Sequence, residues 1–212
     1  MEQLIQLYNR AIAYMQDEMY EEASNLLEPI LKEEPSFVDA VWALGLIDVL
    51  TGFPHQAIEK WKVIREVKDI DILQAVEKVE QKLPLYDRLY DKNNEAIEQL
   101  QRQNFQVAAN IFDELLVYQK EVPLPISFYF GAVLTKIVIG AEKFAFDEII
   151  SFPAYVRKNE QFQEVEELLH YYLEKFRNSK VMFKDKKTHP KPRGESWYYL
   201  LYRKILLAFK NT

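Results

Sequence analysis

A repeat with a period of 34 residues near the start of the chain constrains its fold more than any other feature. Small residues recur at this spacing in two places, and large apolar residues recur after them. A fixed period of this size is typical of stacked helix–turn–helix units, each of which buries its apolar face against the next. The repeat therefore predicts an array of antiparallel helix pairs. The matching positions are Ala11 and Gly45, Glu18 and Gly52, Ala23 and Ala57, Leu27 and Trp61, and Ile30 and Ile64.

Apolar residues at helical spacing predict helices along most of the chain. An extra helix near 70–82 interrupts the period before a third clear pair, and a fourth pair is degenerate. Only five of the 212 residues are Gly, too few for a turn-rich β architecture, so we predict an all-α fold of about ten helices. The expected helices are 3–16, 20–31, 37–51, 55–67, 70–82, 85–102, 105–119, 126–141, 143–151, 154–178 and 195–210.

The helix pairs resemble the tetratricopeptide repeat. That family places a small residue in the first helix, a small residue in the second, a large apolar residue four places later, and a closing Pro. The resemblance covers 4–69 and 89–120, and it implies a right-handed solenoid over 1–178. The residues that carry it are Ala11, Tyr14, Ala23, Leu27 and Pro35 in the first unit, Gly45, Asp48, Gly52, Ala57 and Trp61 in the second, and Ala96, Ala108 and Phe112 in the third.

The resemblance also implies a concave groove, lined by the first helix of each pair. Some family members clamp a terminal carboxylate there with Lys and Asn, but the matching places in this chain are largely apolar. We therefore expect a non-enzymatic adaptor or scaffold whose groove binds an apolar peptide or helix of another protein. The predicted groove residues are Ile5, Tyr8, Ile12 and Met15, then Trp42, Leu46, Val49 and Leu50, then Tyr90, Asn93, Ile97 and Leu100.

The end of the chain has a different composition from the repeat region. Residues 179–194 form a basic segment interrupted by Pro190, Pro192 and Gly194, and the final helix predicted within 195–212 is apolar on almost all sides. Because such a helix is not stable alone in water, it must be buried. It docks on its own repeat region, covering part of the groove, or pairs with a second copy as a homodimer, or meets a partner or a membrane. Docking on its own chain is favoured, because a tethered segment is present at high effective concentration.

The charges are distributed unevenly. Residues 180–212 hold nine Lys or Arg and two Asp or Glu, a net charge of +7, which leaves −13 for residues 1–179 out of the total of −6. The first interpretation is that the basic tail complements its own acidic body. The alternative is a regulatory protein that contacts nucleic acid or an anionic surface through this tail. Since the acidic body repels a polyanion, a nucleic-acid partner is not expected.

The sequence offers little for catalysis. It lacks Cys, which excludes disulfides and thiolate chemistry, and it has no phosphate-binding loop or nucleophile elbow. Glu167 and His170 have the Glu-x-x-His spacing of di-iron bundles, but the second copy that such a site needs is missing. We therefore expect no catalytic residue, metal or cofactor. The most apolar stretch, 125–141, is too short for a membrane span, and the start of the chain does not read as a signal peptide, so a cytoplasmic protein is expected.

Overall fold

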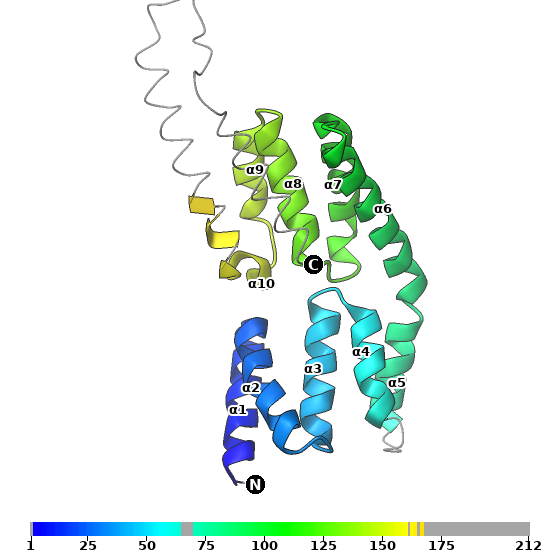
Figure 1. The fold of residues 1–212 in the computed structure, drawn as a ribbon, viewed down its shortest axis with the longest axis vertical. Coiled ribbons are helices and arrows are strands. Elements are labelled where there is room, and N and C mark those ends of the chain that lie inside the picture. The colour runs from blue at the N-terminus through cyan, green and yellow to red at the C-terminus, as the bar shows by residue number, and fades with distance from the viewer. Residues whose placement is uncertain (1, 65–69, 161, 165, 168–212) are drawn as a thin grey trace, which may run out of the picture.

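The computed structural model describes residues 2–64, 70–160, 162–164 and 166–167. This part of the chain folds into ten α-helices and two short 3₁₀ helices, and it contains no strand (Figure 1). The all-α prediction is confirmed for these residues. None of the described helices is both long enough and apolar enough to cross a membrane.

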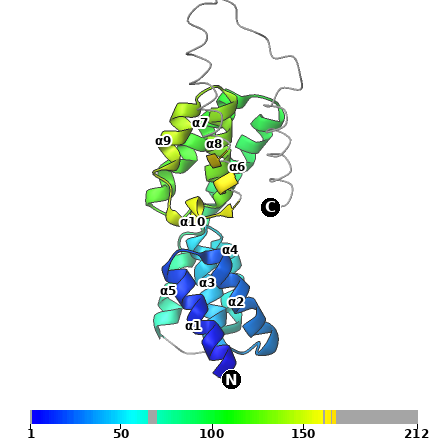
Figure 2. The same ribbon diagram turned by 90° about the vertical axis from the view of Figure 1, so that its left-hand side faces the viewer.

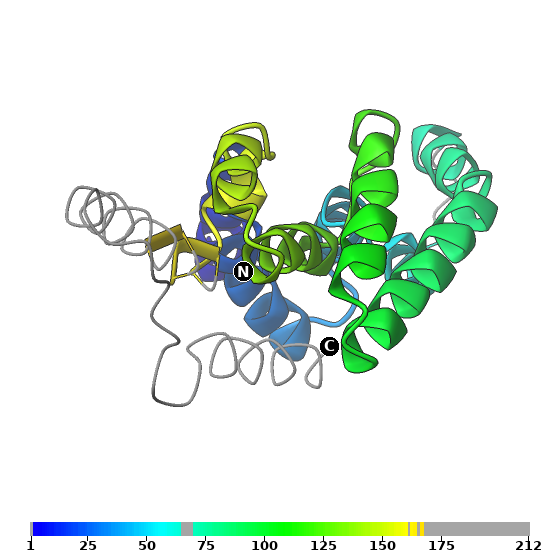
Figure 3. The ribbon, with the colours of Figure 1, turned by 90° about the horizontal axis from the view of Figure 1, so that it is seen from above.

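The helices form two tiers that lie end to end along the long axis (Figures 1 and 2). The chain crosses the first tier from α1 to α5, passes into α6, and returns across the second tier. Figure 3 shows the yellow-green end of the second tier over the blue start of the chain. The N-terminal tier comprises α1 (Glu2–Gln16), α2 (Tyr20–Glu33), α3 (Val38–Leu50), α4 (Pro54–Trp61), η1 (Lys62–Ile64) and α5 (Ile70–Glu80). The C-terminal tier comprises α6 (Leu83–Gln101), α7 (Phe105–Leu116), η2 (Val117–Lys120), α8 (Ile126–Val138), α9 (Glu142–Ile149) and α10 (Ala154–Arg157).

One type of turn closes four helix pairs, α1–α2, α3–α4, α6–α7 and α8–α9. In each turn the second residue after the first helix has a positive φ, and the N–H of the next residue donates to the carbonyl oxygen five positions earlier at 2.6 to 2.9 Å. This is the bonding of a Schellman motif, which satisfies carbonyls at a helix end. The structure therefore contains four copies of one helical hairpin. The residues with positive φ are Glu18 (56°), Gly52 (87°), Gln103 (62°) and Gly140 (78°).

The four hairpins share a packing register that can be counted from the residue with positive φ. Five positions later, all four hairpins have a fully buried Ala, and nine positions later they have a large buried apolar residue. The predicted burial of Ala23 and Ala57 is thereby confirmed. The fourth hairpin follows at a spacing of 37 rather than 34, which is why its register is difficult to see in the sequence. The two sets are Ala23, Ala57, Ala108 and Ala145, and Leu27, Trp61, Phe112 and Ile149.

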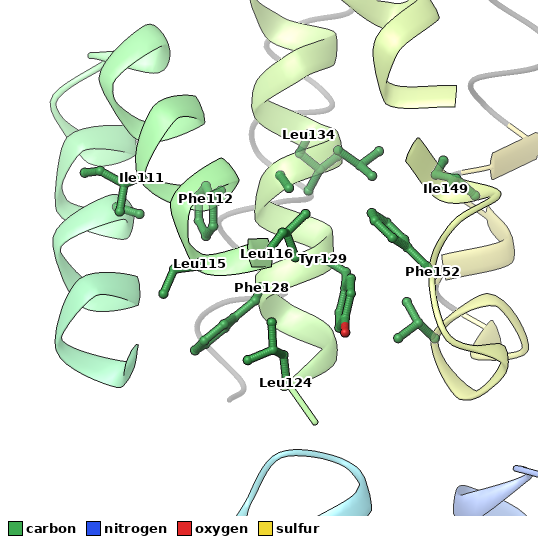
Figure 4. Packing of buried hydrophobic residues seen from close by; sticks show 14 of the residues in the cluster. Ile111, Phe112, Leu115, Leu116, Leu124, Phe128, Tyr129, Leu134, Ile149 and Phe152 are labelled. Carbon is green, nitrogen blue, oxygen red and sulfur yellow. The ribbon is translucent and has the colours of Figure 1, made fainter. Parts of the chain in front are cut away.

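In each tier, a large aromatic side chain packs directly against a glycine of a neighbouring helix. A Cβ at Gly45 would overlap the indole of Trp61, which is fully buried and donates from Nε1 to the carbonyl of Trp42 at 3.2 Å. A Cβ at Gly131 would likewise overlap the ring of Phe112, in the core of the C-terminal tier (Figure 4). Each glycine thus provides the space into which a bulky neighbour packs.

The segment after α9 differs from the single helix predicted over 154–178. α10 ends at Arg157, a turn follows at 158–159, and helical residues resume at 160. Asn159 accounts for this break, because its Oδ1 accepts a hydrogen bond from the N–H of Phe162 at 3.2 Å, as a helix N-cap does. The predicted basic segment 179–194 and the apolar helix 195–210 lie outside the described residues.

Candidate partner-binding surfaces

The predicted groove residues of the first unit lie along one side of α1. Ile5 is 46% exposed, whereas Tyr8 and Ile12 are half-buried and pack on the core formed by the first three helices. The Tyr8 ring lies 5.7 Å from that of Phe37, just before α3. Burial raises the pKa of Tyr8, and the nearby carboxylate of Asp39 adds to this shift. This side of α1 is therefore apolar and only partly covered.

The predicted groove residues of the second unit are half-buried on α3. Trp42, Leu46 and Val49 pack against the cluster that joins α3, α4 and α5, to which α5 contributes Val76. The Trp42 ring stacks on that of Trp61, with centroids 4.5 Å apart. Beside them, Leu50 remains 37% exposed at the end of α3. α3 thus carries an apolar stripe in the same tier as that of α1.

The third set of predicted groove residues lies in the other tier. Tyr90 is half-buried, and its hydroxyl donates to the carbonyl of Gly52 at the boundary between the tiers. Asn93 is buried and Ile97 is half-buried, both further along α6. The predicted groove residues on α1 and α3 therefore lie together in the N-terminal tier, whereas those on α6 lie in the C-terminal tier.

A cleft of about 610 Å³ lies between the two tiers. It is bounded by the α1–α2 turn and α2, the end of α3 with the α3–α4 turn, the start of α8, and α10 with the turn that follows it. Two contacts close one side of it: the Tyr155 N–H donates to Glu18 Oε2 at 3.2 Å, and the rings of Tyr20 and Tyr155 lie 5.8 Å apart. The Lys158 ammonium also donates to the carbonyl of Asp17.

Carboxylates dominate the polar lining of this cleft. Its six acidic residues face a single basic one, Lys158. Only Asp48 among the six has an ion pair within the described part of the chain, with Lys60 at 2.5 Å. Burial raises the pKa of Asp48, and Lys60 opposes this shift. The acidic lining residues are Glu18, Glu21, Glu22, Glu28, Asp48 and Glu160.

The cleft lining also includes apolar and aromatic residues, among them Tyr20, Phe53, Ile126 and Tyr155. Burial raises the pKa of Tyr20, and the Glu18 carboxylate raises it further. The sequence analysis did not predict this site. Glu21 and Glu22 have the pattern of a solvent-exposed helix face, and the residues opposite them across the cleft lie more than a hundred positions later in the chain. No local pattern links the two sides.

The far side of the tier boundary is held by contacts between α4 and α6. His55 Nε2 lies 2.8 Å from Asp87 Oδ1, and the His55 ring lies 6.3 Å from that of Tyr90. Between the two sides, Gly52 packs directly on the backbone of Leu124 and Pro125. The tiers therefore meet at three places around the cleft.

Nothing in the described residues points to metal chemistry. No three His, Asp or Glu side chains there gather into a possible metal site. Glu167 is exposed, and its sequence partner His170 lies outside the described residues. Comparisons of the chain with protein-family models, with curated proteins and with solved structures each find no match.

Proposed function

We propose that this protein is a non-enzymatic interaction module of the tetratricopeptide-like class, acting as an adaptor in the cytoplasm. The four hairpins with one turn geometry and one register of buried residues support this class, since helical arrays of this kind present extended surfaces to other proteins. The arrangement proposed for the hairpins is a right-handed superhelical stack. The binding surface is the apolar side of α1 and α3, called here the inner face: Ile5, Tyr8, Ile12, Trp42, Leu46, Val49 and Leu50.

The exposure of apolar side chains on the inner face carries the proposal. Ile5 and Leu50 are large apolar residues that remain exposed, and each lies beside half-buried neighbours on its helix. An apolar surface of this kind marks an interaction site more often than isolated exposed residues do. Its chemistry suits the apolar face of an amphipathic helix, which would cover Ile5 and Leu50 and contact the half-buried row.

Selection of peptides from a random library, with the full chain as bait, tests this function. We expect the selected peptides to share apolar residues at helical spacing. Ile5→Asp and Leu50→Asp should weaken their binding by about tenfold or more, because each places a charge in an apolar contact. Trp42→Ala is a poorer probe, since it also removes the stacking on Trp61 and thereby affects the fold.

Val117→Asp is the matched control. Val117 is 72% exposed on η2, in the other tier, so this variant introduces the same charge away from the inner face. It should bind the selected peptides as the wild type does. Equal loss of binding in all three variants, or no loss in Ile5→Asp and Leu50→Asp, would remove the inner face as the binding surface.

A further inference from the structure

The α1–α2 turn is bonded across the tier boundary to the segment around α10. Glu18 Oε2 accepts a hydrogen bond from the N–H of Tyr155 at 3.2 Å, and the Lys158 ammonium donates to the carbonyl of Asp17. The rings of Tyr20 and Tyr155 lie 5.8 Å apart beside these bonds. The two hydrogen bonds join residues 137 and 141 positions apart, so they tie the first hairpin to the C-terminal tier. These five residues are called here the latch.

Glu18 takes part in the latch with an unfavourable backbone. Its φ is 56°, a conformation that a residue with a Cβ rarely adopts, and two of the three equivalent turn residues are Gly. The third, Gln103, has a φ of 62°, but its side chain makes no hydrogen bond within the described residues. In that part of the chain, Glu18 is thus the one turn residue whose side chain bonds the other tier. Strained residues cluster at clamps and switch regions, and the latch is such a place.

The boundary is built differently away from the latch. The backbone of Gly52 packs on that of Leu124 and Pro125 with no room for a Cβ, and α4 is in contact with α6. The chain itself crosses the boundary through the short turn at 81–82, between α5 and α6, on the side opposite α10 (Figure 1). This side is therefore held by close packing and by the covalent chain, whereas the latch side has two hydrogen bonds and a ring contact at the edge of the cleft.

We propose that the latch is a closing device: the tiers pivot about the side where α5 enters α6, and the latch holds them together around the cleft. A hydrogen bond to a carboxylate is stronger than one between neutral groups, but water can bond both groups once they separate. Opening the latch therefore costs little, and an open form exists as a minor state, as in other hinged proteins. The proposal is independent of the proposed function, because the latch and the inner face share no residue.

Distances between pairs of spin labels measure this pivoting in the full chain. The chain has no Cys, so labels attach only where Cys is introduced. Ala13→Cys and Ile150→Cys place one label in each tier on the latch side, in α1 and just after α9, and both positions are exposed (Figure 1). Glu59→Cys and Asp91→Cys place a second pair at exposed positions of α4 and α6, on the pivot side.

Glu18→Gly removes the carboxylate and also relieves the left-handed backbone, so this variant should fold. We expect the open form, in which the 13–150 distance is longer by more than about 2 Å, to become about tenfold more populated. The 59–91 distance should stay as in the wild type. Lys158→Met removes the other hydrogen bond of the latch and should lengthen the 13–150 distance in a smaller fraction of the molecules.

Gln103→Gly is the matched control, because it relieves the same backbone conformation in the α6–α7 turn, far from the boundary (Figure 1). It should leave both distances unchanged. An unchanged 13–150 distance in both Glu18→Gly and Lys158→Met would overturn the proposal, and so would equal changes in Glu18→Gly and Gln103→Gly. A longer 59–91 distance in Glu18→Gly would also contradict it, since the tiers would then separate as a whole rather than pivot.

Discussion

At the scale of single residues, the turns show how the same backbone geometry is reached with different side chains. Two of the four residues with positive φ are Gly, and the other two are Glu18 and Gln103. For a residue with a Cβ this conformation costs about 1 kcal/mol, which the turn bonding evidently offsets. Gly52 is different, because a Cβ there would lie 2.5 Å from the nitrogen of Pro125. Only at Gly52 does the adjacent tier add a second requirement for glycine.

Gly52→Ala should therefore destabilise the fold more than Gly140→Ala does. Both residues have positive φ, but a Cβ at Gly140 meets nothing within 4 Å. We expect Gly140→Ala to cost about 1 kcal/mol from the backbone alone, and Gly52→Ala to cost about 1–3 kcal/mol more from overlap with the backbone of the other tier. Urea unfolding of the two variants measures the difference. Equal losses of unfolding free energy in the two variants would show that the backbone of the other tier leaves room for a Cβ at position 52.

Gln103→Gly should have the opposite effect. Gln103 is exposed with a φ of 62°, and within the described residues its side chain makes no hydrogen bond. Replacement by Gly relieves the left-handed strain at the expense of extra freedom in the unfolded chain, so a net gain of about 0.5 kcal/mol is expected. A fall in the denaturation midpoint would mean that the Gln103 side chain stabilises the turn in some other way.

At the scale of elements, the helices of each hairpin meet at the buried Ala five positions after the turn residue. A side chain larger than a methyl group would separate the two helices there, because interiors are packed too densely to absorb it. The same requirement explains why Gly45 lies against Trp61. The 34-residue repeat therefore records helix contacts. It holds between the first two hairpins, whereas α5 lengthens the spacing before the third hairpin and the fourth turn is displaced by three residues.

Ala23→Leu should reduce the free energy of unfolding by about 1–3 kcal/mol through overpacking. Ala13→Leu is the matched control, since Ala13 is exposed on α1 and the same substitution there adds no buried volume. Thermal and urea unfolding of the two variants, together with helix content from circular dichroism, measure the effect. If Ala23→Leu were tolerated as well as Ala13→Leu, the hairpin would not be packed as described.

At the scale of the whole molecule, tyrosines make long-range contacts both across the tier boundary and within the C-terminal tier. The Tyr90 hydroxyl donates to the carbonyl of Gly52 across the boundary, whereas the Tyr86 hydroxyl donates to the carbonyl of Pro123 at 2.9 Å and the Tyr155 hydroxyl to that of Leu124, both within the C-terminal tier. Burial raises the pKa of Tyr86 and Tyr155 well above the ordinary value near 10, and it raises the pKa of Tyr129 to about 12. The core of the C-terminal tier and the tier boundary thus depend on neutral phenols.

Stability should fall at alkaline pH for this reason. Below pH 10 these phenols are protonated in both the folded and the unfolded chain, so they add no pH dependence. Between pH 10 and about 12 the unfolded chain releases protons that the folded chain retains at Tyr129, and stability falls by about 1.4 kcal/mol per pH unit for each such tyrosine. Urea unfolding from pH 8 to 11.5 measures this slope. Tyr129→Phe should make it shallower, and an unchanged slope would show that Tyr129 ionises as readily in the folded chain.

The sequence by itself determined most of the helices and, in the first three hairpins, the small and large apolar residues that are buried between them. Apolar periodicity and the spacing of small residues such as Ala23 and Ala57 reflect contacts between neighbours in the chain, so a single sequence retains them. It also indicated which sides of α1 and α3 are apolar. It did not indicate the break at Asn159, where one side-chain cap overrides a continuous helical pattern.

Only the tertiary structure decided how the two tiers meet. The cleft combines Glu18 with Tyr155, and the boundary combines Gly52 with Leu124 and Pro125. These partners are 72 to 137 positions apart, and neither periodicity nor composition relates one to the other. Their meeting depends on the direction in which the chain leaves α5, and that direction is set by the packing of the complete molecule.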